Sequence, residues 1–244
     1  MIPRFGTASM RILSIDTSST TGSVAVVAGQ TLLAEITIAR RETHSRRLMD
    51  MIDGALNMAG LDLKELDGLA YTRGPGSFTG LRIGLSVIKG LALVSAKPLV
   101  GVSGLEVLAH QAPDRSHLIC PMMDARNNEV YCARYRYLDN GLQRVVDEAA
   151  LSPEDALAGI TEKCLLVGDG ALRYRTLMEE RLGMLARFAA PDHGIPRALT
   201  VARLSLAKFE AGNTDDLQSV VPLYLRKSYA EQSRALTHAA ETDK

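Results

Sequence analysis

The sequence lacks most of the features that mark secreted, membrane-spanning and zinc-binding proteins. Its 244 residues include no tryptophan and only three cysteines, Cys120, Cys132 and Cys164, with no CxxC pair among them. Such thiols are expected to be buried and free rather than paired in disulfides or bound to zinc. No apolar run approaches the ~20 residues of a membrane span, and the first ten residues lack the apolar segment of a secretory signal. We therefore expect a cytoplasmic protein with no membrane contact.

An excess of charge of one sign is missing as well. Lys and Arg together number 28, and Asp and Glu together also number 28, so no overall field draws the chain to nucleic acid or anionic lipid. One local basic cluster consists of Arg40, Arg41, Arg46 and Arg47. We expect this cluster to be a solvated face or to pair with a partner's carboxylates, and any contact with nucleic acid there to be auxiliary.

Signatures of catalysis are equally scarce. No two of the five histidines stand at the HxxxH or HExxH spacing that places two ligands on one helix face. No local pattern marks a nucleophile together with its base. The sequence therefore predicts neither a metal ligand nor a catalytic residue.

What the chain does contain is one order of elements, present twice. The first copy is expected to have strands at Arg11–Asp16, Val24–Ala28 and Thr31–Ile38, a helix from about Thr43 to Ala59, a strand at Leu69–Thr72, a helix from about Gly80 to Ala96 and a strand at Pro98–Val102. The second copy is expected to have strands at Leu118–Met123, Glu129–Leu138 and Leu142–Ala149, a helix starting at Ser152, a strand at Cys164–Val167 and a helix from about Ala171. We infer an α/β protein made of a duplicated domain, with mixed sheets, helices packed on them and a cleft between the copies.

The boundary between the two copies is expected at Gln111–Asp114, a polar stretch that contains a proline. The first domain is thus predicted at residues 10–111 and the second at residues 112–228. Residues 1–9 and 229–244 carry none of the repeated pattern, and we expect them to be flexible.

Two sets of polar and glycine residues are candidates for the cleft. Asp16, Thr17 and Ser18 join the first two strands, where hydroxyls and backbone donors could cradle a phosphate or a carboxylate could hold magnesium. The matching residues of the second copy are Asp124, Gly168, Asp169 and Gly170. Polar hairpin loops explain both sets equally well, so the sequence leaves the two interpretations open.

A glycine-rich segment, Arg73–Arg82, lies between a predicted strand and a predicted helix. A helix that begins there could hold an anion. The segment matches neither the Walker A loop nor the dinucleotide fingerprint, and we favour a purely structural turn.

Two predicted helices carry more apolar surface than one sheet face needs. Apolar residues span roughly 180° of the helix at 43–59, and the polar residues of the helix at 80–96 occupy only a narrow arc. We therefore predict a protein interface, in a homodimer or a heterodimer. Burial under the chain's own second domain is the alternative. The residues assigned to this interface are Met51, Ile52, Ala55, Met58, Gly84, Ile88 and Leu91.

Several segments resemble a known family. They are Ile12–Ser18, Thr43–Ser45, Arg73–Arg82, Met123–Arg126 with Glu129–Tyr131, and Pro222–Arg226. From Met10 to about Gln232 the chain is similar to the bacterial tRNA threonylcarbamoyladenosine biosynthesis proteins of the TsaB, or YeaZ, type. This resemblance implies the actin-like ATPase fold, a tandem of RNase H-like domains.

The resemblance also implies a function. It is that of a noncatalytic subunit that binds and positions the metal-containing paralogue TsaD, with the ATPase TsaE, for threonylcarbamoyl transfer to the adenosine beside the anticodon. The HxxxH metal motif of TsaD falls on Gly104 and Leu108 of this sequence, and neither side chain can bind a metal. We further expect tRNA contact only within the complex, a homodimer when the chain is alone, and no cofactor beyond weak ATP or ADP binding with magnesium. The alternative is a small magnesium-dependent ATPase or kinase of the same fold that uses Asp16 and Asp124.

Overall fold

The first half of the chain forms a five-stranded mixed sheet. The computed structural model describes residues 9–39 and 44–226, with side chains from residue 47 onward in the second range. The strands are β1 (Arg11–Asp16), β2 (Thr21–Ala28), β3 (Thr31–Ala39), β4 (Gly68–Gly74) and β5 (Leu99–Ser103), in the spatial order β3-β2-β1-β4-β5. β1, β2 and β3 pair antiparallel, whereas β4 pairs parallel with both β1 and β5.

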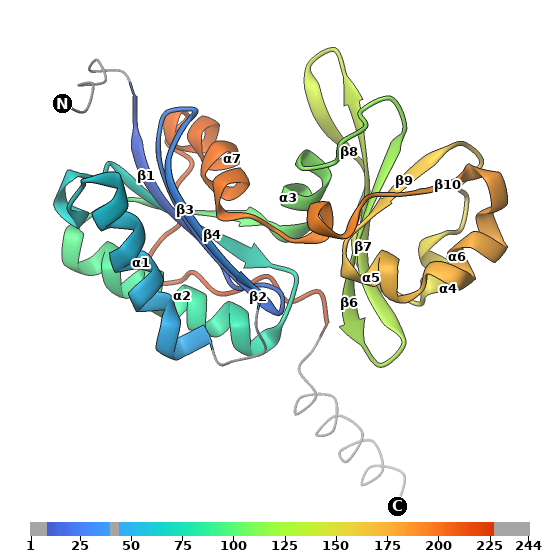
Figure 1. Cartoon of the computed structure of the whole chain (residues 1–244), viewed down its shortest axis with the longest axis horizontal. Helices are drawn as coiled ribbons and strands as arrows, with labels where there is room; N and C mark the ends of the chain where they lie inside the picture. The colour runs from blue at the N-terminus through green and yellow to red at the C-terminus, as the bar shows by residue number, and fades with distance from the viewer. Residues whose placement is uncertain (1–8, 40–43, 227–244) are drawn as a thin grey trace, which may run out of the picture.

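The second half repeats this sheet. Its strands are β6 (Leu118–Arg126), β7 (Glu129–Leu138), β8 (Gly141–Leu151), β9 (Cys164–Val167) and β10 (Ala186–Phe188), in the order β8-β7-β6-β9-β10. As in the first sheet, the first three strands, β6, β7 and β8, pair antiparallel, whereas β9 pairs parallel with both β6 and β10. The predicted duplication is confirmed: two RNase H-like domains lie side by side (Figure 1). The short strand β10 was not predicted.

Helices cover both faces of both sheets. They are α1 (His44–Ala59), α2 (Phe78–Ser95), α3 (Gly104–His110), α4 (Pro153–Ala156), α5 (Asp169–Arg173), α6 (Arg175–Leu182) and α7 (Ala198–Glu210), with 3-10 turns at Leu63–Glu65, Gly183–Leu185 and Pro191–Gly194. Alternate residues of a strand point to opposite faces. On β1, Leu13 therefore packs with α1 and α2 and Ile12 packs with α7. The predicted capping residue Ser152 does cap α4, where its hydroxyl accepts a hydrogen bond from the Asp155 amide.

The domain boundary predicted from the sequence needs a correction. The helix α7 lies within the range 112–228 that was assigned to the second domain, yet it packs on the first sheet, where Val201 and Leu206 join the core formed with Ile12. Conversely, α3 contributes Leu105 and Leu108 to the core of the second sheet. The chain crosses between the domains twice, so contiguous sequence ranges do not describe them.

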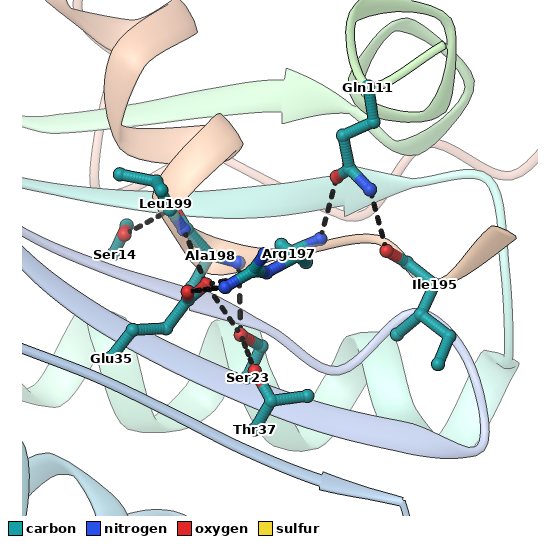
Figure 2. Close-up of polar contacts among 9 residues, drawn as sticks. All are labelled: Ser14, Ser23, Glu35, Thr37, Gln111, Ile195, Arg197, Ala198 and Leu199. Carbon is teal, nitrogen blue, oxygen red and sulfur yellow. Dashed lines mark hydrogen bonds and ion pairs between the residues drawn. The ribbon is translucent and has the colours of Figure 1, made fainter. Parts of the chain in front are cut away.

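The start of α7 is fixed by polar groups of the first sheet, as Figure 2 shows. The first amides of a helix have no acceptor within the helix. Here the Ala198 amide donates to Ser23 Oγ at 3.0 Å, and the Leu199 amide donates to Glu35 Oε1 at 3.2 Å. Ser14 Oγ donates to the Ala198 carbonyl at 2.7 Å. The sheet thus supplies the acceptors that α7 lacks, although its sequence offers no capping side chain at Arg197.

Helix α2 is long and apolar enough to span a membrane, although the sequence shows no uninterrupted apolar run of that length. Helices that pack in the core of a protein have the same length and composition. Leu85, Ile88 and Ala92 of α2 are buried in the first core, and this packing accounts for its apolar composition on that side.

Candidate ligand cleft and partner surface

A cleft of about 620 Å³ lies between the two domains. The first domain lines it with Ser18–Thr20, Gly76–Gly80 and Ile83, and the rest of the chain lines it with Met123–Arg126, Tyr131, Asp169 and Arg226. Three of the seven residues predicted for the cleft, Ser18, Asp124 and Asp169, are among these. The other four, Asp16, Thr17, Gly168 and Gly170, are not part of its lining.

The turn that holds Asp16, Thr17 and Ser18 is closed off by the glycine-rich loop. All three residues are buried, and Asp16 Oδ1 accepts hydrogen bonds from the Ser18 amide at 3.3 Å and the Ser18 hydroxyl at 2.7 Å. Thr17 Oγ1 donates to the Gly80 carbonyl at 2.8 Å. A Cβ atom at Gly76 would lie 2.3 Å from the Ser18 carbonyl oxygen, and one at Gly80 would lie 2.1 Å from that of Thr17. Glycine is needed there because the loop rests directly on the turn.

The carboxylate of Asp124 is engaged by two arginines of its own domain. Arg173 Nη1 lies 2.7 Å from Asp124 Oδ2, and the Arg126 amide donates to Asp124 Oδ1 at 3.0 Å. Asp169 Oδ1 accepts from the Asp124 amide at 3.0 Å. Although Asp169 as a residue is exposed, its carboxylate lies against this backbone, and the loss of hydration, together with the charge of Asp124, raises the pKa of Asp169.

The glycines of the second copy serve close packing. Gly168 has a φ of +117°, and a Cβ atom there would lie 2.1 Å from the Met122 carbonyl oxygen. A Cβ atom at Gly170 would lie 2.8 Å from the Met123 carbonyl carbon. Both glycines let the start of α5 approach β6 closely. Their role here is therefore structural packing rather than ligand binding, which was the other interpretation of the sequence.

These contacts do not fit a magnesium ion held jointly by Asp16 and Asp124. Magnesium in nucleotide sites is bound by carboxylates that stay open to water and phosphate. Asp16 is fully buried behind the turn, and Asp124 is neutralised by Arg173. The remaining lining of the cleft consists mainly of the hydroxyl groups of Ser18–Thr20 and the first turn of α2.

The cleft also contains a side chain that the sequence analysis did not assign to it. Arg226 lines the cleft and its Nη1 lies 2.5 Å from Glu129 Oε2. The segment Pro222–Arg226 was recognised as part of the family pattern, but its position depends on contacts with residues more than 90 positions away along the chain. No local signal in the sequence could have placed it.

The predicted partner surface needs a correction too. Met51, Ile52, Ala55, Gly84 and Ile88 are buried in the first domain, and four of them belong to its main core. They face the chain's own sheet, so they cannot form an external interface. The apolar arcs are wide because each helix packs against both the sheet and the other helix.

Of the seven predicted interface residues, Met58 is exposed and Leu91 is partly buried. The most exposed apolar side chains of these helices are Met49, Met58, Leu93 and Val94, with exposed fractions of 46%, 71%, 66% and 85%, and Phe78 follows at 37%. We call Met58, Leu93 and Val94, which lie near the C-terminal ends of the two neighbouring helices (Figure 1), the outer α1–α2 surface. Met49 precedes Met58 by nine residues, about 180° around α1, and so lies on the other side of that helix.

The basic cluster falls largely outside the described residues. This applies to Arg40 and Arg41, and to the side chain of Arg46. Arg47 lies half-buried in the first turns of α1.

Comparison with known proteins decides the family. The tRNA threonylcarbamoyladenosine biosynthesis protein TsaB of Escherichia coli is 34% identical over 227 residues, which cover 91% of this chain and 96% of the relative. The chain belongs to the TsaB family. Residues 31–233 also match the family model described as TsaD, tRNA N6-adenosine threonylcarbamoyltransferase. TsaB proteins thus share the fold of that transferase family.

Solved structures agree with this assignment. YeaZ from Pseudomonas aeruginosa superposes with a TM-score of 0.76 at 29% identity and covers 88% of this chain and 100% of its own. Component A of the Acidaminococcus fermentans (R)-2-hydroxyglutaryl-CoA dehydratase superposes with a TM-score of 0.50 at 13% identity, over 80% of this chain and 97% of its own. The second likeness shows the fold alone. The TsaB-family chain therefore has the tandem-domain architecture of the actin-like ATPase fold.

Proposed function

We propose that this chain is a noncatalytic subunit of the tRNA threonylcarbamoyladenosine machinery, which binds the catalytic paralogue TsaD and positions it for transfer. Membership of the TsaB family supports a role in this pathway. The observation that carries the subunit role is the outer α1–α2 surface. Val94 and Met58 are 85% and 71% exposed although both are large and apolar, and they lie on two helices that contact each other. Exposed apolar side chains that gather in one patch mark protein contacts.

A partner with the same architecture fits this surface. The chain matches the TsaD family model over most of its length, so the proposed partner would carry two comparable helices, and a pair of apolar helix faces can pack ridges into grooves. A second copy of the chain offers the same helices, and we propose that the chain forms a homodimer when TsaD is absent. Because the pathway acts on tRNA, we propose that the assembly is cytoplasmic.

The noncatalytic role is supported at the positions that correspond to the metal histidines of TsaD. Gly104 and Leu108 stand there, both buried in α3. A Cβ atom at Gly104 would lie 3.2 Å from the Pro75 carbonyl oxygen and 3.3 Å from the Thr72 side chain. Even the first carbon of a side chain at this position would be tightly packed against the loop in front of α2. The chemistry would therefore come from the partner.

The cleft supports at most weak nucleotide binding. Hydroxyl groups line the cleft, but Arg226 is paired with Glu129, Asp16 is buried and Asp124 is paired with Arg173. Calorimetric titration of the isolated chain with ATP and magnesium tests this point. Weak binding or none is expected, whereas tight magnesium-dependent binding would favour the alternative, a small ATPase or kinase.

The function itself is tested by reconstitution. Purified TsaD, TsaE, ATP, a threonylcarbamoyl donor and unmodified tRNA are combined with and without this chain, and the modified adenosine is quantified by mass spectrometry. We expect no modification by this chain without TsaD, and a large gain when it is added to TsaD and TsaE. Equal modification in its presence and absence would refute the proposal.

A further inference from the structure

The chain beyond α7 forms a strap, residues 215–226, that runs from the first sheet to the second domain. The Asp215 amide donates to the Leu99 carbonyl at 2.8 Å, which places the strap beside β5. Leu217 and Val220 then pack against the first core. Figure 1 shows this segment passing along the first domain towards the turn between β6 and β7. The strap is therefore anchored on the first domain before it reaches the cleft.

Two contacts hold the strap at the mouth of the cleft. The Leu223 amide donates to the Arg73 carbonyl at 2.7 Å, and the Leu223 carbonyl oxygen occupies space that a Cβ atom at Gly74 would fill, at 2.5 Å. Arg82 Nε donates to Tyr224 Oη at 3.0 Å. These contacts attach the strap to the end of β4 and to the start of α2.

Aromatic packing strengthens the attachment to α2. The Arg82 guanidinium lies 3.9 Å from the centre of the Phe78 ring, and the rings of Phe78 and Tyr224 are 5.0 Å apart. Arginine over an aromatic face is attracted by the ring quadrupole. The two rings and the guanidinium thus form one unit that joins the first turns of α2 to the strap.

Two residues further on, the strap reaches the second domain. Arg226 forms an ion pair with Glu129 at 2.5 Å, at the start of β7. The side chains are 22% and 34% exposed, so the pair is shielded from water more than a typical surface ion pair. Leu223 to Arg226 therefore span the cleft from one domain to the other.

The opposite connection between the domains is made where the chain crosses twice. Gln111 Nε2 donates to the Ile195 carbonyl at 2.8 Å, and the Arg197 amide donates to Gln111 Oε1 at 2.9 Å, so the two crossing segments are bonded to each other (Figure 2). Ser103 Oγ also donates to Glu148 beside them. The two crossing segments, held together by these hydrogen bonds, can therefore serve as the hinge between the domains.

We infer that the strap is a latch that holds the cleft closed through Arg226 and Glu129. Rotation of the second domain about the crossings separates β7 from β4, and the ion pair must break before the cleft can widen.

The latch is tested on the isolated full-length chain by double electron–electron resonance. Spin labels are placed at exposed positions of the two domains, through Lys64→Cys and Glu180→Cys. The three native thiols are buried and do not compete for the label. Arg226→Ala and Glu129→Ala each remove the latch, and Arg175→Ala removes an ion pair of similar length, 2.7 Å to Glu179, that lies within α6.

We expect both latch variants to increase the population at longer distances roughly twofold to fivefold, the range for loss of one partly shielded ion pair. Arg175→Ala should leave the distribution unchanged. The exchanged pair Arg226→Glu with Glu129→Arg should restore the wild-type distribution. Circular dichroism reports whether each variant is folded. An unchanged distribution in a folded Arg226→Ala or Glu129→Ala variant would overturn the latch, and this result is independent of any partner.

Discussion

Truncation of Glu35 to alanine is expected to destabilise the first domain far more than the loss of an ordinary surface carboxylate. The Glu35 side chain is only 5% exposed. Its Oε1 accepts from the Leu199 amide at 3.2 Å and from Arg197 Nε at 3.3 Å, and its Oε2 accepts from Arg197 Nη2. The variant would leave the Leu199 amide without its acceptor and would weaken the attachment of α7 to the first sheet.

The magnitude follows from these contacts. A buried donor that loses its acceptor costs about 1–3 kcal/mol, and an ion pair with a half-exposed arginine such as Arg197 contributes about 0.2–1 kcal/mol. We therefore expect Glu35→Ala to lower the free energy of unfolding by about 2–3 kcal/mol, which corresponds to a fall in Tm of about 5–10 °C. Glu35→Gln keeps an acceptor for the Leu199 amide and should lose less than half of this.

The assay is urea and thermal unfolding followed by circular dichroism. Glu179→Ala is the matched control, because it removes an exposed glutamate from an ion pair of 2.7 Å within one helix, and pairs of this kind contribute about 0.2–0.5 kcal/mol. If Glu35→Ala shifts Tm no more than Glu179→Ala does, the polar contacts at the start of α7 do not fix this helix to the sheet, and the reasoning is wrong.

Three further predictions concern the glycines, a carboxylate and the first core. Gly80→Ala should lower the free energy of unfolding in urea by more than about 2 kcal/mol, because its Cβ would lie 2.1 Å from the Thr17 carbonyl oxygen. Gly90→Ala, with no atom within 4 Å of the added carbon, should raise it by about 0.5–1 kcal/mol. The pKa of Asp169 is raised in the folded state, so its ionisation opposes folding; Asp169→Asn should raise Tm at pH 7, and the gain should vanish below the unfolded pKa near 4. Met51→Glu places a charge in the first core and should abolish folding, which a native-like circular dichroism spectrum would contradict.

Much of the fold could be predicted from local pattern. β1, β7 and β9 begin and end where predicted, since alternating or short apolar runs bounded by turns identify strands well. The duplication followed from the order of elements alone. In contrast, β10 has only three residues, too few to carry a periodic signal. The placement of α7 on the first sheet depends on Ser23 and Glu35, about 160 to 175 positions earlier in the chain.

The candidate sites were predicted less well, for a physical reason. An apolar arc on a helix shows that the helix is covered but not what covers it, so Met51 and Ile88 were assigned to a partner when they face their own sheet. Val94, the most exposed of the apolar residues on α1 and α2, was not selected. Similarly, Asp16 ends β1 and Asp124 lies near the end of the equivalent strand β6. Whether a carboxylate is open to a ligand depends on its neighbours, and Arg173 is 49 positions from Asp124.

The proposed subunit role is tested most directly by light scattering on a sizing column with this chain, TsaD, and an equimolar mixture of the two. Met58→Glu and Met184→Glu make the same change at methionines that are 71% and 92% exposed, the first on the outer α1–α2 surface and the second far from it in the second domain. The account predicts a stable complex for the wild type and Met184→Glu, and separate peaks for a folded Met58→Glu variant. Absence of a complex for the wild type, even with ATP and TsaE included, would contradict the proposed subunit role. An undiminished complex for Met58→Glu would show that the outer α1–α2 surface does not bind TsaD.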